Sequence, residues 1–365
     1  MPSCPFAFPR GSTEKVAENR RHARNARLYT ALDRHGTTDR TPSASFSAGS
    51  RDSRLDYVTV GHVTRDVIER STGDTISQPG GGAFYSALQA ARLGLRTLIV
   101  TQGVRAEIEA LLAPYLDEFD LHVIPAEHTT TLLTSGTGPK RSQRVLAWAG
   151  PMSRPLELHS SILHFAPVAR EALIAWSGSA RFIGITPQGL LRRWSESSMV
   201  PLVQLDTGSL LGDIPFALPA TDAPAGDISL VALAPAALPA RFHAAVIGEQ
   251  ECSSCHALFT AARSVGAQVA VTAGSRPTTI HLPSSPSVQT PLPPIVAVRD
   301  DIGAGDVFAA AFFVALTDGR APREAATFGN AAASVRIAGV GPQAIGSGAS
   351  IEAVLRTKPR EAQDR

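Results

Sequence analysis

The sequence predicts an α/β fold built around a mostly parallel central sheet, and three observations support this prediction. Short β-branched segments alternate along the chain with segments whose apolar residues recur at helical spacing. Strands that alternate with helices in this way pair in parallel through right-handed crossovers. Apolar residues make up 44% of the chain and charged residues 18%, which is enough to bury a sizeable core. The 30 glycines and 27 prolines fit a mixed protein that is rich in loops.

The two ends of the chain differ from its middle. Residues 1–54 carry many arginines, have no sustained apolar period and lack the apolar stretch of a signal peptide. We therefore expect residues 1–54 to form a disordered N-terminal extension. The folded domain is expected over residues 55–348, and residues 349–365 are expected to form a C-terminal helix or tail.

In the first half of the domain, strands and helices are expected to alternate. The segment at 55–61 is β-branched and ends in glycine, which is typical of a buried strand. A helix is expected at 83–93, because its apolar residues fall at helical spacing and Gly94 follows as a stop. The next expected elements are a strand at 96–101, a helix at 104–115, a strand at 121–125, and an exposed hairpin with strands at 129–134 and 144–148.

The second half continues the alternation, with two irregular stretches. Residues 206–240 are rich in proline, glycine and alanine and receive no assignment, and the proline-rich residues 283–294 indicate a surface loop or an edge hairpin. The expected elements are strands at 162–166, 181–185, 244–247 and 268–272, and helices at 169–176 and 251–265.

Charge, hydropathy and cysteine content exclude several classes of partner. The net charge of +2, from 34 basic and 32 acidic residues, gives no excess that would favour nucleic acid or an anionic membrane. The longest apolar run, at 307–316, is too short to span a bilayer. The 3 cysteines cannot build a disulfide framework, which favours a reducing, cytoplasmic location. We expect a protein that binds a small molecule, with no nucleic-acid or membrane partner.

The segment with the clearest chemical content begins the apolar helix near residue 304. Gly303, Ala304 and Gly305 form a turn of small residues, and Asp306 follows in the first helical turn. Glycines let the backbone approach a ligand, and the first amides of a helix have no internal acceptor, so this turn is suited to an anion. A carboxylate beside an anion site suits phosphoryl transfer, because the carboxylate takes a proton from the accepting hydroxyl. On spacing alone, an ordinary capped helix is an equally sound interpretation.

The same segment carries a family resemblance. Residues 300–308 read Asp-Asp-Ile-Gly-Ala-Gly-Asp-Val-Phe, which resembles the C-terminal signature of the ribokinase-like (PfkB) carbohydrate kinases. Further matches follow the family's order, and the resemblance extends over about residues 55–346. These matches are residues 58–61 with Asp66, the Gly80-Gly81 helix start, residues 269–274 and residues 330–333. Residues 141–151, 162–167 and 187–192 are most similar to inositol-kinase-like members.

The resemblance implies a three-layer α/β/α fold with a mostly parallel sheet and a small β lid, formed by residues of about 62–80 and 128–149. It also implies ATP-dependent phosphorylation of a hydroxyl on a sugar or cyclitol, with Mg2+. In this assignment Asp306 is the general base, and the backbone amides of Ile302, Gly303, Ala304 and Gly305 form the anion hole.

Further roles are implied residue by residue. Asp66 would hold substrate hydroxyls, and Gly80 and Gly81 would hinge the lid and approach the substrate. Tyr85 occupies a substrate-side position that is often asparagine in sugar kinases, which argues against ribose. The residues implied on the donor side are Thr272, Gly274 and Asn330 near the nucleotide, and Glu251, which would order Mg2+ through water.

Departures from the family pattern leave alternatives open. Gly248 replaces the asparagine expected before Glu251, Pro277 replaces a glycine of the nucleotide loop, and Asp301-Ile302 replaces a threonine pair. A nucleoside kinase of the same fold, or a catalytically weak sugar-binding relative, therefore remains an alternative.

Other signals point less clearly to function. Arg144, in the expected lid, is a candidate for contacting substrate, although a solvated charge fits as well. Cys252 and Cys255 have the spacing of half a zinc site without a second pair, so incidental thiols are expected. His62 and His164 lie near strand ends, where packing is the simpler interpretation. An exposed lid hairpin would also allow a homodimer through the lid.

Overall fold

The computed structural model describes residues 55–69, 73–136, 142–152, 156–171, 176–194, 226–227, 229–230, 232–233, 238–239, 241–294 and 297–357. The expected extension at residues 1–54, most of residues 206–240, Arg141 and residues 358–365 lie outside the described residues.

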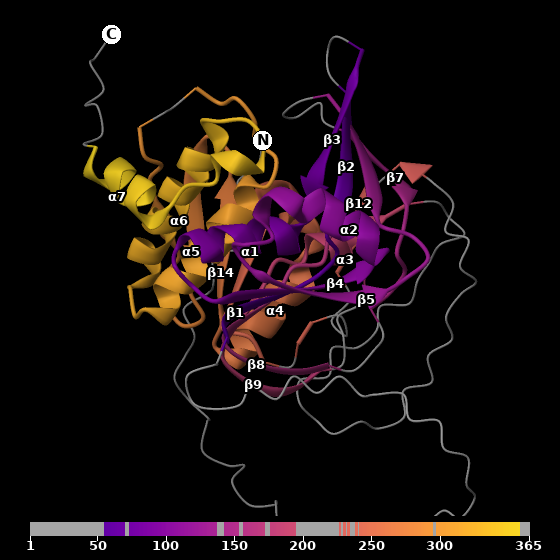
Figure 1. Ribbon diagram of the computed structural model, residues 1–365. Coiled ribbons are helices and arrows are strands. Elements are labelled where there is room, and N and C mark those ends of the chain that lie inside the picture. Colours follow the sequence, from indigo (N-terminus) through magenta and orange to yellow (C-terminus); the bar gives the residue numbers. More distant parts are fainter. Residues whose placement is uncertain are drawn as a thin grey trace, which may run out of the picture.

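A nine-stranded sheet forms the centre of the fold, in the order β16-β15-β14-β13-β9-β8-β1-β4-β5 (Figure 1). All pairs from β14 to β5 are parallel, and only β15 and β16 join in antiparallel fashion at one edge. The mostly parallel sheet predicted from the sequence is thus confirmed. The strands are β1 (Leu55–Val60), β4 (Thr97–Gly103), β5 (Asp120–Pro125), β8 (Leu156–Phe165), β9 (Trp176–Ile185), β13 (Ala244–Gly248), β14 (Gln268–Ala273), β15 (Arg276–His281) and β16 (Val288–Thr290).

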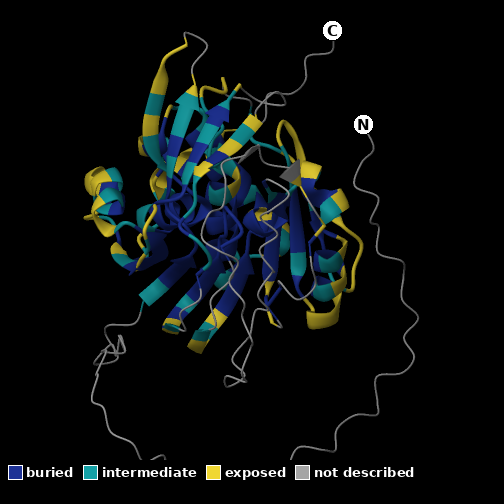
Figure 2. Cartoon of the chain, turned by 90° about the vertical axis from the view of Figure 1, so that its right-hand side faces the viewer, coloured by how far each residue is buried: buried dark blue, intermediate teal, exposed yellow. Residues whose placement is uncertain are grey.

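Helices cover both faces of this sheet and complete three layers. Alternate residues of β1 enter two separate cores, since Tyr57 belongs to one hydrophobic cluster and Val58 and Val60 to the other. Figure 2 shows the resulting burial of the sheet on both faces. The first cluster is covered by α1 (Gly82–Arg92), α2 (Arg105–Leu112), α5 (Ala304–Thr317), α6 (Pro322–Ile337) and α7 (Gly348–Arg356), and the second by α3 (Gln188–Leu191), the short helix η4 (Glu249–Ser254) and α4 (His256–Val265).

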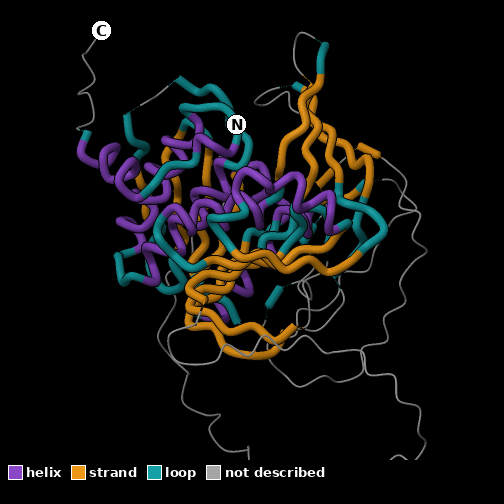
Figure 3. The backbone as a smooth tube through the Cα atoms, viewed as in Figure 1, coloured by secondary structure: helices purple, strands orange, loops and turns teal. Residues whose placement is uncertain are grey.

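A second sheet of five strands stands at one end of the large sheet (Figure 3). Because β1 runs directly into β2, this small sheet lies at the carboxyl edge of the large one, where parallel α/β sheets place their ligands. Its order is β11-β7-β6-β2-β3, with β2 (Thr64–Glu69), β3 (Thr75–Gly80), β6 (Thr131–Ser135), β7 (Ser142–Ala147) and β11 (Gly226–Asp227). A two-stranded ribbon pairs β10 (Arg192–Arg193) with β12 (Ser229–Leu230).

Helix α5 is apolar on every side and runs through the interior. A helix of this kind must be buried all round, and residues 307–315 are indeed buried. Small residues on its neighbours make room for its rings: a Cβ on Gly184 would lie 2.4 Å from Cε2 of Phe313, and one on Gly329 would lie 2.8 Å from Cδ2 of Phe308. This tight packing fixes the position of the N-terminus of α5 at the carboxyl edge of the sheet.

Four local expectations need correction or refinement. The helix expected at 169–176 is wrong at both ends, because residues 168–170 are bends and Trp176 begins β9; residues 172–175 are outside the described part. Arg170, at φ 54°, adopts a left-handed conformation that a helix does not tolerate. The helix expected at 251–265 begins as the 3-10 helix η4. The proline-rich segment contributes β16 to an edge hairpin. In the expected C-terminal tail, α7 packs onto the domain through the fully buried Ile351.

Within the described ranges, none of the helices combines the length and the hydrophobicity needed to cross a bilayer.

Candidate active site

The N-terminus of α5 presents backbone donors, as the glycine turn predicted. Gly303 is the N-cap residue and has φ 75°, a conformation that favours glycine. The Ile302 amide donates to Oδ1 of Asp300 (3.0 Å) and the Ala304 amide to the Asp301 carbonyl (3.3 Å). Among the described residues, the amides of Gly303 and Gly305 have no acceptor. Of the four amides expected to form an anion hole, only those of Gly303 and Gly305 therefore remain available. Among the described residues the amide of Asp306 also has no acceptor, so it is a third available donor.

Asp306 lies at the meeting point of two helix starts. Its carboxylate faces the first residue of α1, since a Cβ on Gly82 would lie 2.9 Å from Oδ1. The Ser86 hydroxyl donates to the Asp306 carbonyl at 3.2 Å, which also ties α1 to α5. Burial raises the pKa of Asp306 to about 7; Arg192 opposes this effect, and nearby carboxylates reinforce it. A carboxylate with this pKa accepts protons efficiently near neutral pH.

Arg192 is a buried cation that sequence reasoning did not assign to the site. Its guanidinium donates to the Val168 carbonyl (2.7 Å) and to the side chains of Gln143 (2.8 Å) and Gln188 (3.0 Å). Burial lowers its pKa, and four carboxylates counteract this by favouring the charged form. These carboxylates belong to Glu251, Asp66, Asp306 and Glu171. The segment 187–192 carried the inositol-kinase resemblance, so a signal was present, but it did not indicate a role for Arg192.

Glu251 is held by groups from two sides. Its carboxylate accepts from the Gly248 amide (2.9 Å) and from Nε2 of Gln188 (2.9 Å). Burial raises its pKa, while these two hydrogen bonds and Arg192 oppose the rise. Gln188 bonds both Glu251 and Arg192, so it links the acid to the cation. The glycine that replaces the expected asparagine thus contributes its amide to the position of Glu251.

Asp66 projects from the inner face of the small sheet. It is 5% exposed, and its Oδ1 accepts from the Thr64 hydroxyl at 2.6 Å. A Cβ on Gly80 would lie 2.1 Å from its Oδ2, so only glycine leaves room for this carboxylate. Burial raises the pKa of Tyr85, and the charge of Asp66 adds to this rise. Gln78, paired with Asp66 across β2 and β3, reaches the Tyr85 hydroxyl at 3.4 Å.

Arg144 lies on the other face of the small sheet. Side chains alternate along a strand, and in β7 it is Gln143 that reaches Arg192, whereas the neighbouring Arg144 is exposed. The structure therefore brings Gln143, and not Arg144, to the acidic cluster.

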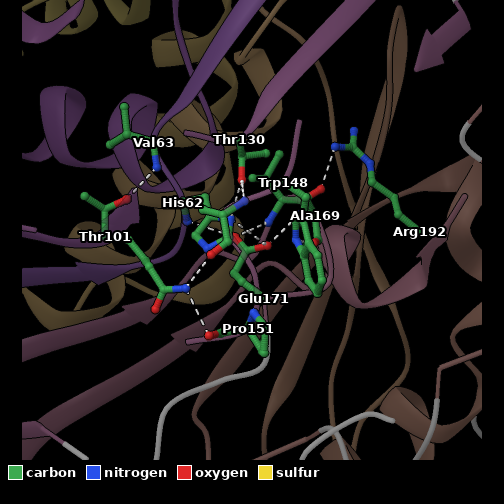
Figure 4. Close-up of polar contacts among 12 residues, drawn as sticks. His62, Val63, Thr101, Thr130, Trp148, Pro151, Ala169, Glu171 and Arg192 are labelled. Atoms are coloured by element: carbon green, nitrogen blue, oxygen red, sulfur yellow. Dashed lines mark hydrogen bonds and ion pairs between the residues drawn. The ribbon is translucent and has the colours of Figure 1, made fainter. Parts of the chain in front are cut away.

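A buried carboxylate holds the junction between the two sheets (Figure 4). Glu171 accepts from the backbone amides of His62 (2.8 Å), Val168 (2.7 Å) and Ala169 (2.5 Å). A Cβ on Gly81, which has φ 94°, would lie 2.2 Å from the His62 carbonyl. The two ends of the β2–β3 hairpin are thus held together at His62 and Gly81.

The two histidines near strand ends are core residues. His62 is fully buried and its Nδ1 bonds the Thr130 hydroxyl (2.8 Å), and burial lowers its pKa. His164 is also fully buried between Tyr57 (2.9 Å) and Thr186 (3.1 Å), and burial lowers its pKa to about 3. Both histidines therefore serve packing.

The residues expected near the nucleotide lie at the end of β14 and on α6. Thr272 and Gly274 lie at the carboxyl end of β14, and Gly274 has φ 61° with open space where a Cβ would be. Asn330 is 4% exposed; its amide accepts from the Thr278 hydroxyl (2.8 Å) and donates to the Pro291 carbonyl (3.2 Å). These two contacts tie α6 to the edge hairpin, so a contact between Asn330 and a nucleotide stays a prediction.

Metal-ligating groups are sparse in the described part of the chain. It contains no group of three or more His, Cys, Asp or Glu side chains that would hold a metal ion. Cys252 and Cys255 are both buried.

Comparison with known proteins gives the fold and a family match. Residues 233–347 match the model of the pfkB family carbohydrate kinases, a stretch that includes Glu251, Asp306 and the glycine turn. The chain has a ribokinase-like fold, and its C-terminal part resembles the pfkB family. The resemblance inferred from the sequence is thereby confirmed. Comparison with curated protein sequences gives no match.

Solved structures of the ribokinase family share this fold. A pyrophosphate-dependent kinase complexed with a pyrophosphate analog and myo-inositol is 15% identical (TM-score 0.58) and covers 81% of this chain and 99% of its own. The Methanocaldococcus jannaschii nucleoside kinase is 16% identical (TM-score 0.58), with coverages of 83% and 98%. Arabidopsis thaliana ribokinase, complexed with ribose and ATP, is 19% identical (TM-score 0.53), with coverages of 84% and 100%. At such identities the likeness establishes the fold and leaves substrate and donor open.

Proposed function

We propose that this protein is an ATP-dependent kinase that phosphorylates a hydroxyl of a sugar or cyclitol, with Asp306 as general base. The observation that carries the proposal is that Asp306, whose pKa is raised to about 7, lies in the first turn of α5, where the amides of Gly303 and Gly305 have no acceptor among the described residues. A base and an anion site in the same helical turn are what transfer of a phosphoryl group to an alcohol requires.

The reaction follows from this arrangement. The acceptor hydroxyl gives its proton to the Asp306 carboxylate as its oxygen attacks the terminal phosphorus of the donor. The bond from that phosphorus to the bridging oxygen breaks, and the leaving diphosphate keeps the electron pair. The amides of Gly303 and Gly305 and the Arg192 guanidinium balance negative charge on the moving group.

The acceptor is held on the side of the small sheet. The Asp66 carboxylate accepts hydrogen bonds from substrate hydroxyls, and the polar groups of Gln78 and Tyr85 border the same space. A buried carboxylate suits a polyol, because each hydroxyl donates to it without bringing a charge. This supports a sugar or cyclitol as the substrate class.

The donor is placed along the carboxyl ends of β13 and β14. In the proposal Thr272 and Gly274 approach the nucleotide, and Asn330 flanks its base. The buried Glu251 fits the role of holding Mg2+ through water, because Mg2+ keeps several waters and is bound mainly by the phosphates. Bound Mg2+ would supply positive charge to the phosphates, and Glu251, held by Gln188, would orient its water ligands.

The experiment is a transfer assay that varies donor and acceptor separately. Inositols, ketoses, aldoses and nucleosides are each offered with ATP-Mg2+ or pyrophosphate-Mg2+, and product phosphate is followed by 31P NMR. We expect transfer from ATP to a sugar or cyclitol, and its loss in Asp306→Asn. Binding of a sugar without turnover would favour the alternative of a non-catalytic relative, and a nucleoside as the best acceptor would favour a nucleoside kinase.

A homodimer through the small sheet is part of this proposal. Leu146 lies on the outer face of β7 and is 42% exposed, which favours burial against a second copy. Light scattering of the wild type and of Leu146→Glu tests it: a dimer that the substitution dissociates is expected, and a monomeric wild type contradicts it.

A further inference from the structure

Arg336 is a fully buried arginine on α6, at the end nearest the anion-binding turn. Its Nη2 donates to Oδ2 of Asp300 at 2.7 Å, and its Nη1 donates to the Asp300 carbonyl at 3.2 Å. A weaker bond reaches the Gly339 carbonyl at 3.5 Å. The Arg336 guanidinium therefore binds both the side chain and the backbone of Asp300, the residue that precedes the turn.

Asp300 connects this cation to the amides of the site. Its Oδ1 accepts from the Ile302 amide at 3.0 Å, and its Oδ2 accepts from the Gly341 amide at 2.8 Å. Although burial acts to raise the pKa of Asp300, the bonds from Arg336 and from these two amides hold that pKa below its usual value. The ionised carboxylate of Asp300 thus links the loop after α6 to the start of the turn.

The same guanidinium also contacts the turn indirectly, through the ring of Tyr85. Its central carbon lies 5.6 Å from the centroid of the Tyr85 ring, at cation–π distance. That ring packs directly against the turn, since a Cβ on Gly303 would lie 2.3 Å from Cδ1 of Tyr85. Arg336 therefore fixes Gly303 through two routes, one through Asp300 and Ile302 and one through Tyr85.

We propose that Arg336 is a positioning residue for the phosphoryl-binding turn, and that it holds the Gly303 and Gly305 amides at the donor phosphate through Asp300 and Tyr85. The inference rests on the proposed function, since it assigns a residue that prepares the same site.

Electrostatics favour this role over simple stabilisation. An uncompensated carboxylate at Asp300 would repel a phosphate at the neighbouring amides, and Arg336 cancels its charge. A buried ion pair is seldom more stabilising than apolar residues of the same volume, so stability alone does not account for it. Within the described residues the Arg336 Nε has no hydrogen-bond partner, which makes the pair a costly way to gain stability.

The test measures transfer and anion binding separately in the full chain. The variants are Arg336→Lys, Arg336→Met and Arg336→Met/Asp300→Asn; the control is Arg320→Met, which removes an arginine stacked on Phe328 at the opposite end of α5. For Arg336→Met we expect kcat to fall about 100-fold with acceptor KM nearly unchanged, because the donor turn moves while Asp66 does not. Pyrophosphate binding, measured by calorimetry, should weaken about tenfold or more, with Arg336→Lys intermediate and Arg320→Met unchanged.

Two further measurements separate positioning from folding. The double variant leaves no unpaired charge, so it keeps the test valid if Arg336→Met does not fold, and circular dichroism confirms the fold of each variant. In Arg336→Ala, about 10 mM guanidinium chloride should restore part of kcat, whereas equal sodium chloride should not, because guanidinium fills the space that the side chain leaves.

The outcomes separate the inference from the proposed function. A folded variant without Arg336 that keeps wild-type kcat and wild-type pyrophosphate affinity overturns the inference. A wild type that binds no pyrophosphate overturns it as well. A wild type that binds pyrophosphate in an Arg336-dependent way but transfers no phosphate to any acceptor refutes the proposed function and leaves the positioning role standing.

Discussion

Gly82 and Asp306 touch across the starts of two helices: a Cβ at position 82 would lie 2.9 Å from Oδ1 of the Asp306 carboxylate. Such a separation is shorter than real Cβ contacts, so any larger residue at 82 must displace the carboxylate. The same Cβ would lie 3.2 Å from the Ala166 carbonyl, which leaves it little room to move away. Gly82 therefore gives the proposed base its position.

The first prediction is that Gly82→Ala lowers kcat by about 10- to 100-fold, because a displacement of the base by a fraction of an ångström disturbs proton transfer. Steady-state kinetics and a thermal melt measure the two effects separately. Gly348→Ala is the matched control, since the nearest atom to its Cβ would be Cδ2 of Leu93 at the ordinary distance of 3.8 Å. Equal activity in Gly82→Ala and Gly348→Ala would contradict the positioning of Asp306 by Gly82.

Local sequence was sufficient for the parts of the fold and site that depend on neighbours along the chain. The glycine turn and Asp306 lie within one helix start, so backbone physics alone indicated donors beside a carboxylate. The alternation of strands and helices likewise predicted the parallel sheet. The helix expected at 169–176 failed because a short apolar run fits helix or strand equally well, and only tertiary contacts decide between them.

Other features of the site required the three-dimensional structure. Arg192, Glu171 and Arg336 are buried charges, and each has a partner far away in sequence: Gln143, His62 and Asp300, respectively. The periodicity of apolar residues does not predict such pairs, and an arginine is expected at the surface unless other evidence places it in the core. The choice of Gln143 over Arg144 also depends on which face of β7 turns inward, which two adjacent polar residues do not reveal.

The second prediction concerns pH. Burial raises the pKa of Asp306 to about 7, and a general base must be deprotonated to act. We therefore expect kcat/KM to fall tenfold per pH unit below about 7 and to level off above it. A pH profile with a substrate that does not titrate in this range measures it. A flat profile between pH 5 and 8 would contradict the assigned role. The control is to confirm that the enzyme, after incubation at each pH, keeps its full activity when returned to neutral pH.

The third prediction concerns the stability of Asp306→Asn. Because the pKa of Asp306 in the folded protein is about 7, above its ordinary value of 3.8, ionisation at higher pH destabilises the wild type. The full difference would correspond to about 4 kcal/mol, and for a partly exposed side chain we expect about 1–2 kcal/mol. Denaturant titrations should show Asp306→Asn more stable than the wild type at pH 8 and equally stable at pH 4. Loss of stability at pH 8 would refute the burial argument.

The fourth prediction tests Arg192 through its effect on Asp306. Arg192 is the group that most strongly opposes the rise in the pKa of Asp306, so Arg192→Met should move the acid limb of the pH–rate profile to higher pH. It should also lower kcat at saturating pH, because the moving phosphoryl group loses a countercharge. Arg193→Met, at the neighbouring position of the same short strand, is the control and should leave the limb in place. If the acid limb does not move in Arg192→Met, Arg192 does not lower the pKa of Asp306.

The fifth prediction concerns the metal. Glu251 is 3% exposed and accepts from Gly248 and Gln188, so its carboxylate is fixed in place, and the proposed function has it order Mg2+ through water. Glu251→Gln keeps the size of the side chain and removes its charge, and the Mg2+ concentration for half-maximal activity should rise about tenfold, as for loss of an outer-sphere partner.

Glu249→Gln is the control for Glu251→Gln. Glu249 lies on the same 3-10 helix, but it pairs with Arg276 at the surface, so this variant should keep the wild-type Mg2+ requirement. Acceptor KM should be unchanged in both variants, because Asp66 and the small sheet are untouched. Were Glu249→Gln and Glu251→Gln to shift the Mg2+ titration equally, the effect would be one of general charge, and Glu251 would have no particular role at the metal.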